Sequence, residues 1–330
     1  MRRSGSPVVQ EGMALLTVLL LVAVMASLAV AMLDDIRFGL RRGQNAQAMA
    51  RAQWLAISTE TLARAQIRRL LQRDPARTTL EGGWNGRPFV FPVDGGSIRA
   101  VLRDGGNCFN LNSVVEGASE QWRRRAIGVG QYIALLDALG IRGAAAQGLA
   151  DSLVDWIDSD DARSPYGAED DAYARRRPAY RSSDTLLAEA SELRAIAGYD
   201  EGTYRRLRPH VCALPDNVLS PLNLNTLGED DAPLLQMLTA SALDAASARR
   251  VIAARPAPGW RQAAAFWAQP ALLALPLPGE VLGQVGVRTR YFHLQSQVTF
   301  GEAQLEMTEL FDADGAGRVR LLRRRWSEDE

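Results

Sequence analysis

The dominant pattern in this 330-residue chain is an apolar run near its N-terminus. Residues 13–33, MALLTVLLLVAVMASLAVAML, contain no charged side chain. A helix of this length, rising 1.5 Å per residue, covers the roughly 30 Å hydrocarbon core of a bilayer. Arg2 and Arg3 precede the run, so the positive-inside rule keeps the N-terminus in the cytoplasm. The run therefore predicts a single transmembrane helix, with the bulk of the chain on the far side of the membrane.

Helical periodicity continues beyond the apolar run, through residues 34–73. This stretch lacks proline, and its apolar residues recur close to helical spacing with arginine and glutamine between them. These apolar residues are Leu40, Ala48, Ala52, Leu55, Leu62, Ala65 and Leu70. Together the two stretches predict one helix of about 60 residues, roughly 90 Å long. Its distal half is amphipathic and should pack on a folded domain, whereas its apolar half must lie in lipid or among similar helices.

Both ends of the remaining chain alternate apolar and polar residues with the period of β-strands. The strand-like segments are residues 88–93, 97–103, 290–300 and 303–311 and the final RVRLLRRRW. Turn sequences, Asp94-Gly95-Gly96 and residues 312–315, separate neighbouring segments. Because the segments come from both flanks of the chain, they predict a small antiparallel sheet with a long insertion in its middle.

The middle of the chain is rich in alanine and leucine and predicts helices. The expected fold is α+β, in which a long N-terminal helix packs on a small antiparallel sheet that carries a large all-α insertion. The expected segments are a leader at 1–12, a transmembrane segment at 13–33, an α/β core at 34–119 and 286–330, and the helical insertion at 120–285.

The insertion contains a weak internal repeat. FNLNS at residues 109–113 and LNLNT at residues 222–226 each precede a pair of helical segments, and their polar side chains can accept from free N–H groups at helix starts. The turn Leu139-Gly140-Ile141 is of the helix-hairpin-helix kind, which in some proteins offers backbone N–H groups to DNA phosphate. Aspartates surround this turn and would repel phosphate, so a structural hairpin is the favoured interpretation.

Overall composition narrows the function further. The 38 basic residues balance the 38 acidic ones, so no whole-chain field favours nucleic acid. The chain has only two histidines and two cysteines, so a histidine-based catalytic apparatus or a cysteine-rich zinc site is hard to build from it. We therefore expect no enzymatic activity.

One acidic segment stands out, residues 155–171, with the sequence DWIDSDDARSPYGAEDD. Pro165 and Gly167 interrupt the helix between its carboxylates, so these lie on a loop that can fold back. Oxygen donors on a flexible loop suit Ca²⁺, which takes six to eight of them, although the spacing is not that of an EF-hand. A solvated acidic loop is the alternative.

The junction before the apolar run resembles the cleavage site of prepilin peptidases. These enzymes cut after a glycine on the cytoplasmic face, here Gly12, and the mature chain would begin at Met13. Thr17 stands at the fifth mature position, where pilins usually carry glutamate. Three further motifs are LVDWIDSD at residues 153–160, GAEDDAY at residues 167–173 and SELR at residues 191–194. With them, the chain resembles the K-type minor pseudopilins of the type II secretion system over essentially its whole length.

The resemblance implies a non-enzymatic subunit at the tip of a short periplasmic pseudopilus. Such a subunit supports assembly of the pseudopilus and export of folded periplasmic proteins across the outer membrane. An intramembrane carboxylate needs a partner, and Thr17 leaves none to pair with a subunit ahead. The implied partners are the I- and J-type minor pseudopilins, with the H type as a further candidate, the prepilin peptidase and the inner-membrane assembly platform. No nucleic acid is implied, and N-methylation of Met13 is expected.

The resemblance also implies structural Ca²⁺ in the acidic region. The expected ligands are Asp158, Asp160, Glu169, Asp170, Asp171 and Glu192. Outside the inner membrane the compartment is oxidising, so we expect a disulfide between Cys108 and Cys212, with two separate buried thiols as the alternative.

A second function belongs to a different class. The chain could be a single-span anchored periplasmic binding protein whose helix-hairpin-helix units grip a polymer such as DNA. Cleavage after Gly12 separates this alternative from the pseudopilin, because a simple anchor keeps Met1.

Overall fold

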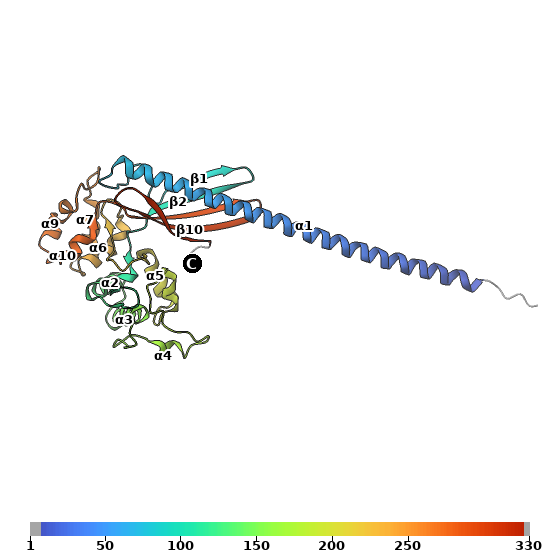
Figure 1. Ribbon diagram of the computed structural model, residues 1–330, viewed down its shortest axis with the longest axis horizontal. Helices are drawn as coiled ribbons and strands as arrows, with labels where there is room; N and C mark the ends of the chain where they lie inside the picture. Colours follow the sequence, from blue (N-terminus) through green and yellow to red (C-terminus); the bar gives the residue numbers. More distant parts are fainter. Residues whose placement is uncertain (1–7, 327–330) are drawn as a thin grey trace, which may run out of the picture.

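One long helix and one antiparallel sheet form the frame of the molecule (Figure 1). The computed structural model describes residues 8–326, with side chains from Met13 onward, so residues 1–7 of the predicted leader lie outside the described part. Helix α1 runs without interruption over Val8–Arg73, which confirms the predicted single helix. Among the described residues it is the one helix long and apolar enough to span a bilayer.

The sheet has five strands, which come from both flanks of the chain as predicted. Their order is β1-β2-β9-β10-β11, and every neighbouring pair is antiparallel. The strands are β1 (Pro88–Val93), β2 (Gly96–Asp104), β9 (Tyr291–Phe300), β10 (Ala303–Ala313) and β11 (Val319–Arg325). The central pairing of β2 with β9 joins two segments from opposite flanks of the chain. It therefore closes the base of the insertion.

One face of α1 packs on this sheet, and only over its distal third. The apolar α1 side chains buried there are Ala52, Ala56, Ala63, Ile67 and Leu71. They recur at helical spacing and meet apolar residues of the inner sheet face, among them Leu102, Phe292 and Val298. Before Ala48 the described side chains of α1 are exposed, so this part of the helix projects away from the domain.

A buried ionic cluster lies within the same interface. Glu60 of α1 pairs with Arg64 at 2.5 Å and with Arg324 of β11, and Arg324 also contacts Glu309 of β10 at 3.2 Å. Burial and the nearby Glu60 carboxylate raise the pKa of Glu309 to about 8. Removing one partner from such a buried group is strongly destabilising, so the cluster fixes the position of the helix on the sheet.

The insertion consists of two consecutive units with the same plan. The first is bounded by β3 (Phe109–Asn110) and β6 (Val211–Cys212), and the second by β7 (Leu222–Asn223) and β8 (Val285–Gly286). Each bounding pair is parallel. The weak repeat in the sequence is thus a structural repeat, and its first strand lies before residue 120, where the insertion was expected to begin.

Each unit contains a helical hairpin. The first pairs α2 (Ala126–Ala138) with α3 (Ala144–Ile157), and the second pairs α6 (Ala232–Leu238) with α7 (Ala245–Ala253). The remaining elements are η1 (Leu111–Val114), β4 (Val115–Glu116), β5 (Arg123–Arg124), α4 (Asp170–Tyr173), η2 (Ala190–Ala195), α5 (Glu201–Leu207), η3 (Arg208–His210), η4 (Glu229–Asp231), α8 (Ala263–Trp267), α9 (Pro270–Leu273) and α10 (Gly279–Gln284). The insertion is therefore mostly helical, with short strands that the sequence did not reveal.

The repeated asparagines connect backbone segments that are far apart in the sequence. Asn112 donates to the carbonyls of Leu187 and Leu214 and accepts from the Leu187 N–H. Asn225, its counterpart, bonds the N–H and the carbonyl of Trp260 in the same way. Buried amides of this kind satisfy backbone groups in irregular segments. They hold these segments instead of capping the helical pairs as the sequence suggested: α2 and α6 start without a side-chain cap, and Asn110 caps only the short η1.

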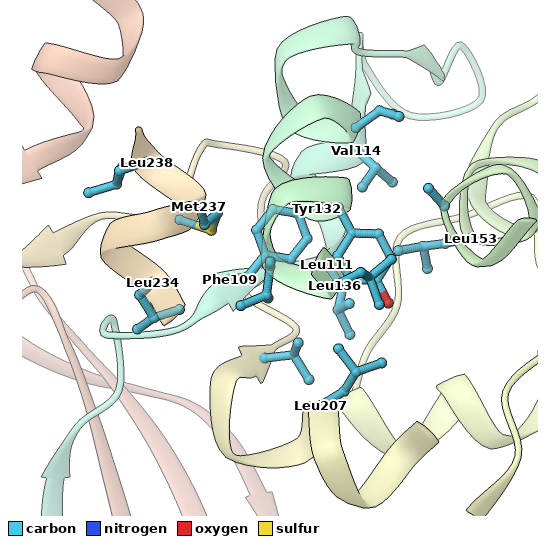
Figure 2. Close-up of a cluster of buried hydrophobic side chains, with 14 of the residues drawn as sticks. Phe109, Leu111, Val114, Tyr132, Leu136, Leu153, Leu207, Leu234, Met237 and Leu238 are labelled. Carbon is cyan, nitrogen blue, oxygen red and sulfur yellow. The ribbon is translucent and has the colours of Figure 1, made fainter. Parts of the chain in front are cut away.

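A single hydrophobic core runs through both units. Figure 2 shows Phe109, Tyr132 and Leu136 of the first unit near Leu234 and Met237 of the second. A disulfide joins Cys108 to Cys212, with the two Cα atoms 5.7 Å apart. It closes the chain around the first unit, and the polymer estimate for a loop of this length is about 4–5 kcal/mol.

Candidate functional site

Three buried carboxylates converge where α3 ends. Asp155 lies in the last turn of α3, Asp158 is the residue that ends it, and Glu169 directly precedes α4. One oxygen from each lies within 4.8 Å of the others. The exposed fractions of the three residues are 0%, 6% and 6%. Three acids this close and this buried require a compensating positive charge or protonation.

The loop between α3 and α4 creates this arrangement by folding back over the helix end. The Ser164 N–H donates to Asp155 at 3.1 Å, and the Arg163 side chain donates to the Gly167 carbonyl at 2.9 Å. Gly167 lies against Asp155 so closely that a Cβ atom there would fall 2.0 Å from a carboxylate oxygen. Only glycine therefore permits the loop to bring Glu169 to the two aspartates.

The electrostatics of this cluster favour a bound cation. Asp158 Oδ1 and Glu169 Oε1 are buried and have no hydrogen-bond partner among the described residues. Burial and the neighbouring acids raise the pKa of Asp158 to about 7 and that of Glu169 to about 8. Arg124 is near, but it pairs with Asp151 at 2.8 Å. Unpartnered carboxylate oxygens facing one another are suitable donors for a hard divalent cation such as Ca²⁺.

The structure brings together only some of the predicted ligands. Asp158 and Glu169 belong to the cluster, and the exposed Asp160 is close enough to raise the pKa of both. Asp155 and Asp184 were missed. Asp155 lies three residues before Asp158, and this spacing places both side chains on one face of a helix. The spacing is a signal in the sequence that could have identified Asp155 as a member of the cluster. Asp184 also raises both pKa values, but it arrives from a distant loop and has no such local signal.

The other three predicted ligands are engaged elsewhere. Asp170 accepts from the N–H and the hydroxyl of Ser182, both at 2.9 Å, and this lowers its pKa. Asp171 is exposed and pairs with Arg175 at 2.8 Å. Glu192 accepts from the N–H groups of Ala188 and Glu189 at the start of η2. Their carboxylates stabilise local structure, and the geometry gives no support for them as ligands of the same ion.

A second candidate site is an apolar stripe on the side of α1 that faces away from the sheet. We define the outward stripe as Ile36, Leu40, Trp54 and Leu62, which point in similar directions at 3.6 residues per turn. The polar Gln47 lies on the same side, between the two pairs. Trp54 is 70% exposed and Leu62 is 55% exposed, whereas Leu55 packs on the sheet. Large apolar side chains aligned on an exposed helix face indicate an interaction surface.

The chain is similar to proteins of one bacterial secretion system. Two family models described as "Type II secretion system (T2SS), protein K" match residues 107–216 and 222–288, which correspond closely to the two units of the insertion. The chain is 32% identical to "Type II secretion system protein K" of Pectobacterium carotovorum, with 96% of each chain covered. It is 34% identical to the protein of the same name from Klebsiella pneumoniae, with 93% of each covered.

A solved structure agrees with these sequence matches. It is the crystal structure of the GspK-GspI-GspJ complex from the type 2 secretion system of enterotoxigenic Escherichia coli. The matched chain is 31% identical and superimposes with a TM-score of 0.75, covering 87% of the present chain and all of the other.

The raised pKa values predict how stability depends on pH in the metal-free protein. The folded cluster binds protons more tightly than the unfolded chain, so its contribution to stability is greatest at acid pH and is lost as pH rises towards about 8. Glu169→Gln keeps the size of the side chain but cannot ionise. In excess EDTA, we expect this variant to melt at a higher temperature than the wild type at pH 8.5 and at nearly the same temperature at pH 5.

The matched control is Asp171→Asn, which removes an exposed acid outside the cluster. It should show no comparable difference between the two pH values. Melting curves of detergent-solubilised full-length protein measure both variants. A Glu169→Gln effect that is the same at pH 5 and pH 8.5 would contradict the assigned electrostatics.

Proposed function

The chain belongs to the protein K family of the type II secretion system, and from this premise we propose that it forms the tip of the periplasmic pseudopilus together with the I- and J-type minor pseudopilins. It is a minor pseudopilin, anchored in the inner membrane by α1, with its main domain in the periplasm. Family membership thus replaces the alternative of an anchored protein that grips DNA. A solved relative assembles with GspI and GspJ, and we extend that partnership to the present chain.

The outward stripe is the observation that supports this proposal most directly. Between the apolar run and the first contact of α1 with the domain, residues 34–47 lie outside both the lipid-spanning segment and the domain. Exposed apolar side chains of the stripe here, Ile36 and Leu40, need cover in water. Helices of neighbouring subunits emerge from the same membrane and run in the same direction, so they can bury the whole length of the stripe.

The tip position rests on two features of this chain. Thr17 leaves no carboxylate in the membrane segment to pair with a subunit ahead, and its hydroxyl bonds instead to the Met13 and Ala14 carbonyls of its own helix. The insertion projects from the end of the frame that is far from the membrane-spanning half of α1 (Figure 1). Its bulk would obstruct a subunit stacked above it.

We further propose that the subunit has no catalytic role. The family supplies a component of a secretion machine, which favours a structural function. The three clustered carboxylates are at most 6% exposed, which leaves little access for a substrate.

Trp54 should be the anchor of the subunit interface, because buried aromatic side chains dominate binding energy at protein contacts. We expect Trp54→Glu to weaken binding of the I- and J-type partners by at least about tenfold without changing the melting temperature, since the side chain is exposed in the free protein. Co-purification of detergent-solubilised full-length proteins, followed by titration, measures this loss. The control Gln53→Glu places the same charge on an exposed position of the neighbouring helix face. Equal partner binding by both variants would exclude the outward stripe as the interface.

A second proposal concerns the carboxylate cluster: Asp155, Asp158 and Glu169 hold a structural Ca²⁺ ion. The support is the unpartnered oxygens of Asp158 and Glu169 and the surplus of negative charge around them. A divalent cation would satisfy these oxygens and cross-link the end of α3 to the segment before α4. Methylation and cleavage at the leader junction, which involve Gly12 and Met13, also remain part of the proposal.

Calcium should stabilise the folded protein by mass action, by about 2.7 kcal/mol at 100 times the dissociation constant. We expect melting temperature to rise with millimolar Ca²⁺ and to fall with EDTA. Asp158→Asn should have opposite effects in the two conditions. In EDTA it should stabilise the protein, because it removes repulsion between the clustered carboxylates. In Ca²⁺ it should be less stable than the wild type, because the stabilisation by the ion is lost. The control Asp171→Asn should respond to Ca²⁺ as the wild type does. Superimposable wild-type melting curves with EDTA and with Ca²⁺ would show that the cluster binds no calcium.

A further inference from the structure

A cavity of about 640 Å³ lies at the membrane-distal end of α1, away from the sites described so far. Its lining comes from three separate parts of the chain: the last turn of α1, the loop over residues 74–81, and the second unit of the insertion. Figure 1 shows the end of α1 and helix α7 at the same end of the molecule, opposite the membrane-spanning half. We call this hollow the apical cavity. Its size falls within the usual range for ligand sites.

The floor of the apical cavity is held by specific contacts. Asn225 accepts from the Trp260 N–H at 2.6 Å and donates to the Trp260 carbonyl at 3.0 Å. Gly259 has a φ of +78°, and a Cβ there would lie 2.8 Å from the Asn225 side-chain oxygen. The loop that carries Gly259 therefore approaches as closely as the backbone allows, which gives the cavity a fixed shape before any ligand binds.

The charges of the lining do not balance locally. Arg255 is half-buried, and its Nη1 donates to the Leu227 carbonyl at 2.6 Å. Burial lowers the pKa of Arg255, and no carboxylate offsets that effect. Arg73 is exposed and forms no ion pair with any residue between 8 and 326. Asp74 is already paired with Arg77 at 2.7 Å. Arg73 and Arg255 therefore both line the cavity, and neither forms an ion pair with a carboxylate among the described residues.

The remaining lining restricts the kind of anion. Leu70, Leu80, Pro256 and Pro258 supply apolar walls beside the arginines. A polyanion such as nucleic acid would meet the acids Asp74 and Glu81 on the same lining. A single carboxylate with apolar neighbours meets both conditions, because arginine pairs with a carboxylate through two parallel hydrogen bonds.

We infer that the apical cavity binds a carboxylate on an extended polypeptide segment, with Arg73 and Arg255 pairing the carboxylate and the leucine and proline walls contacting its apolar neighbours. This inference rests on the proposed tip position, in which the cavity faces away from the other subunits of the pseudopilus. The segment then belongs to a protein met at the distal end of the filament, and it presents either a chain-terminal carboxylate or an acidic side chain.

The test uses full-length protein in detergent micelles and three fluorescently labelled octapeptides of glycine, alanine, leucine and proline. One ends in a free carboxylate, one ends in an amide, and one has the amide end and a single internal glutamate. Fluorescence anisotropy should give a dissociation constant at least about tenfold lower for one of the two acidic peptides than for the neutral amide. Whichever acidic peptide binds more tightly identifies the source of the carboxylate. Equal affinities for all three peptides would overturn the inference.

Variants of the lining sharpen the test. Arg73→Gln and Arg255→Gln should each weaken binding of the preferred acidic peptide about fivefold or more and leave the neutral peptide unchanged. Glu81→Gln removes an exposed acid from the lining and should strengthen binding of the acidic peptide. Arg69→Gln, an exposed arginine one turn earlier on α1 and outside the cavity, is the matched control and should have no effect.

Two outcomes distinguish this inference from simpler explanations. In the first, Arg255 only holds the Leu224 and Leu227 carbonyls in place. Arg255→Gln will then lower the melting temperature, and Arg73→Gln will bind the peptide as well as the Arg69→Gln control does. That result contradicts the inference. Binding of the I- and J-type partners is measured on the same preparations. Its failure contradicts the proposed function, whereas loss of the carboxylate preference contradicts only the assignment of the apical cavity.

Discussion

The contact between one face of α1 and the five-stranded sheet is the constraint on which the rest of the molecule depends. Small and branched residues from Ala52 to Leu71 make this contact, and the Glu60–Arg324 ion pair fixes it across the sheet. Because the helix is far longer than the contact, most of it must be covered by lipid or by other subunits. The same contact determines which side of α1 faces outward, and therefore where Trp54 and Leu62 can meet a partner.

The insertion adds a rigid body to that frame. Its two units share one core, and the asparagines at the start of each unit hold distant loops by hydrogen bonds between side chain and backbone. The first unit presents the carboxylate cluster, where a folded loop concentrates negative charge. The second unit closes against the end of α1 and forms the apical cavity. Two units with the same plan thus present two surfaces with different chemistry.

Contiguous patterns in the sequence were sufficient to predict α1, the sheet drawn from both flanks and the repeat at FNLNS and LNLNT. Each of these features is determined by side chains that lie close together in the sequence. The predicted set of calcium ligands did not anticipate the directions in which individual carboxylates point. Asp170 and Asp171 follow Glu169 directly, yet α4 begins there and turns their carboxylates to Ser182 and Arg175. The proximity of Asp184 to the cluster and the outward position of Leu62, one of the helically spaced apolar residues of α1, depend on tertiary contacts, which no local pattern reports.

The N-terminal mass of the mature protein purified from its membrane tests the central claim most directly. The proposed processing cuts the chain after Gly12 on the cytoplasmic face, which would make the apolar run of α1 the N-terminus of the mature protein and let it enter the filament. The account predicts a chain that begins at Met13 and carries one additional methyl group on its amine. A chain that retains Met1 and the basic leader would contradict it, and would leave a permanently anchored protein in its place.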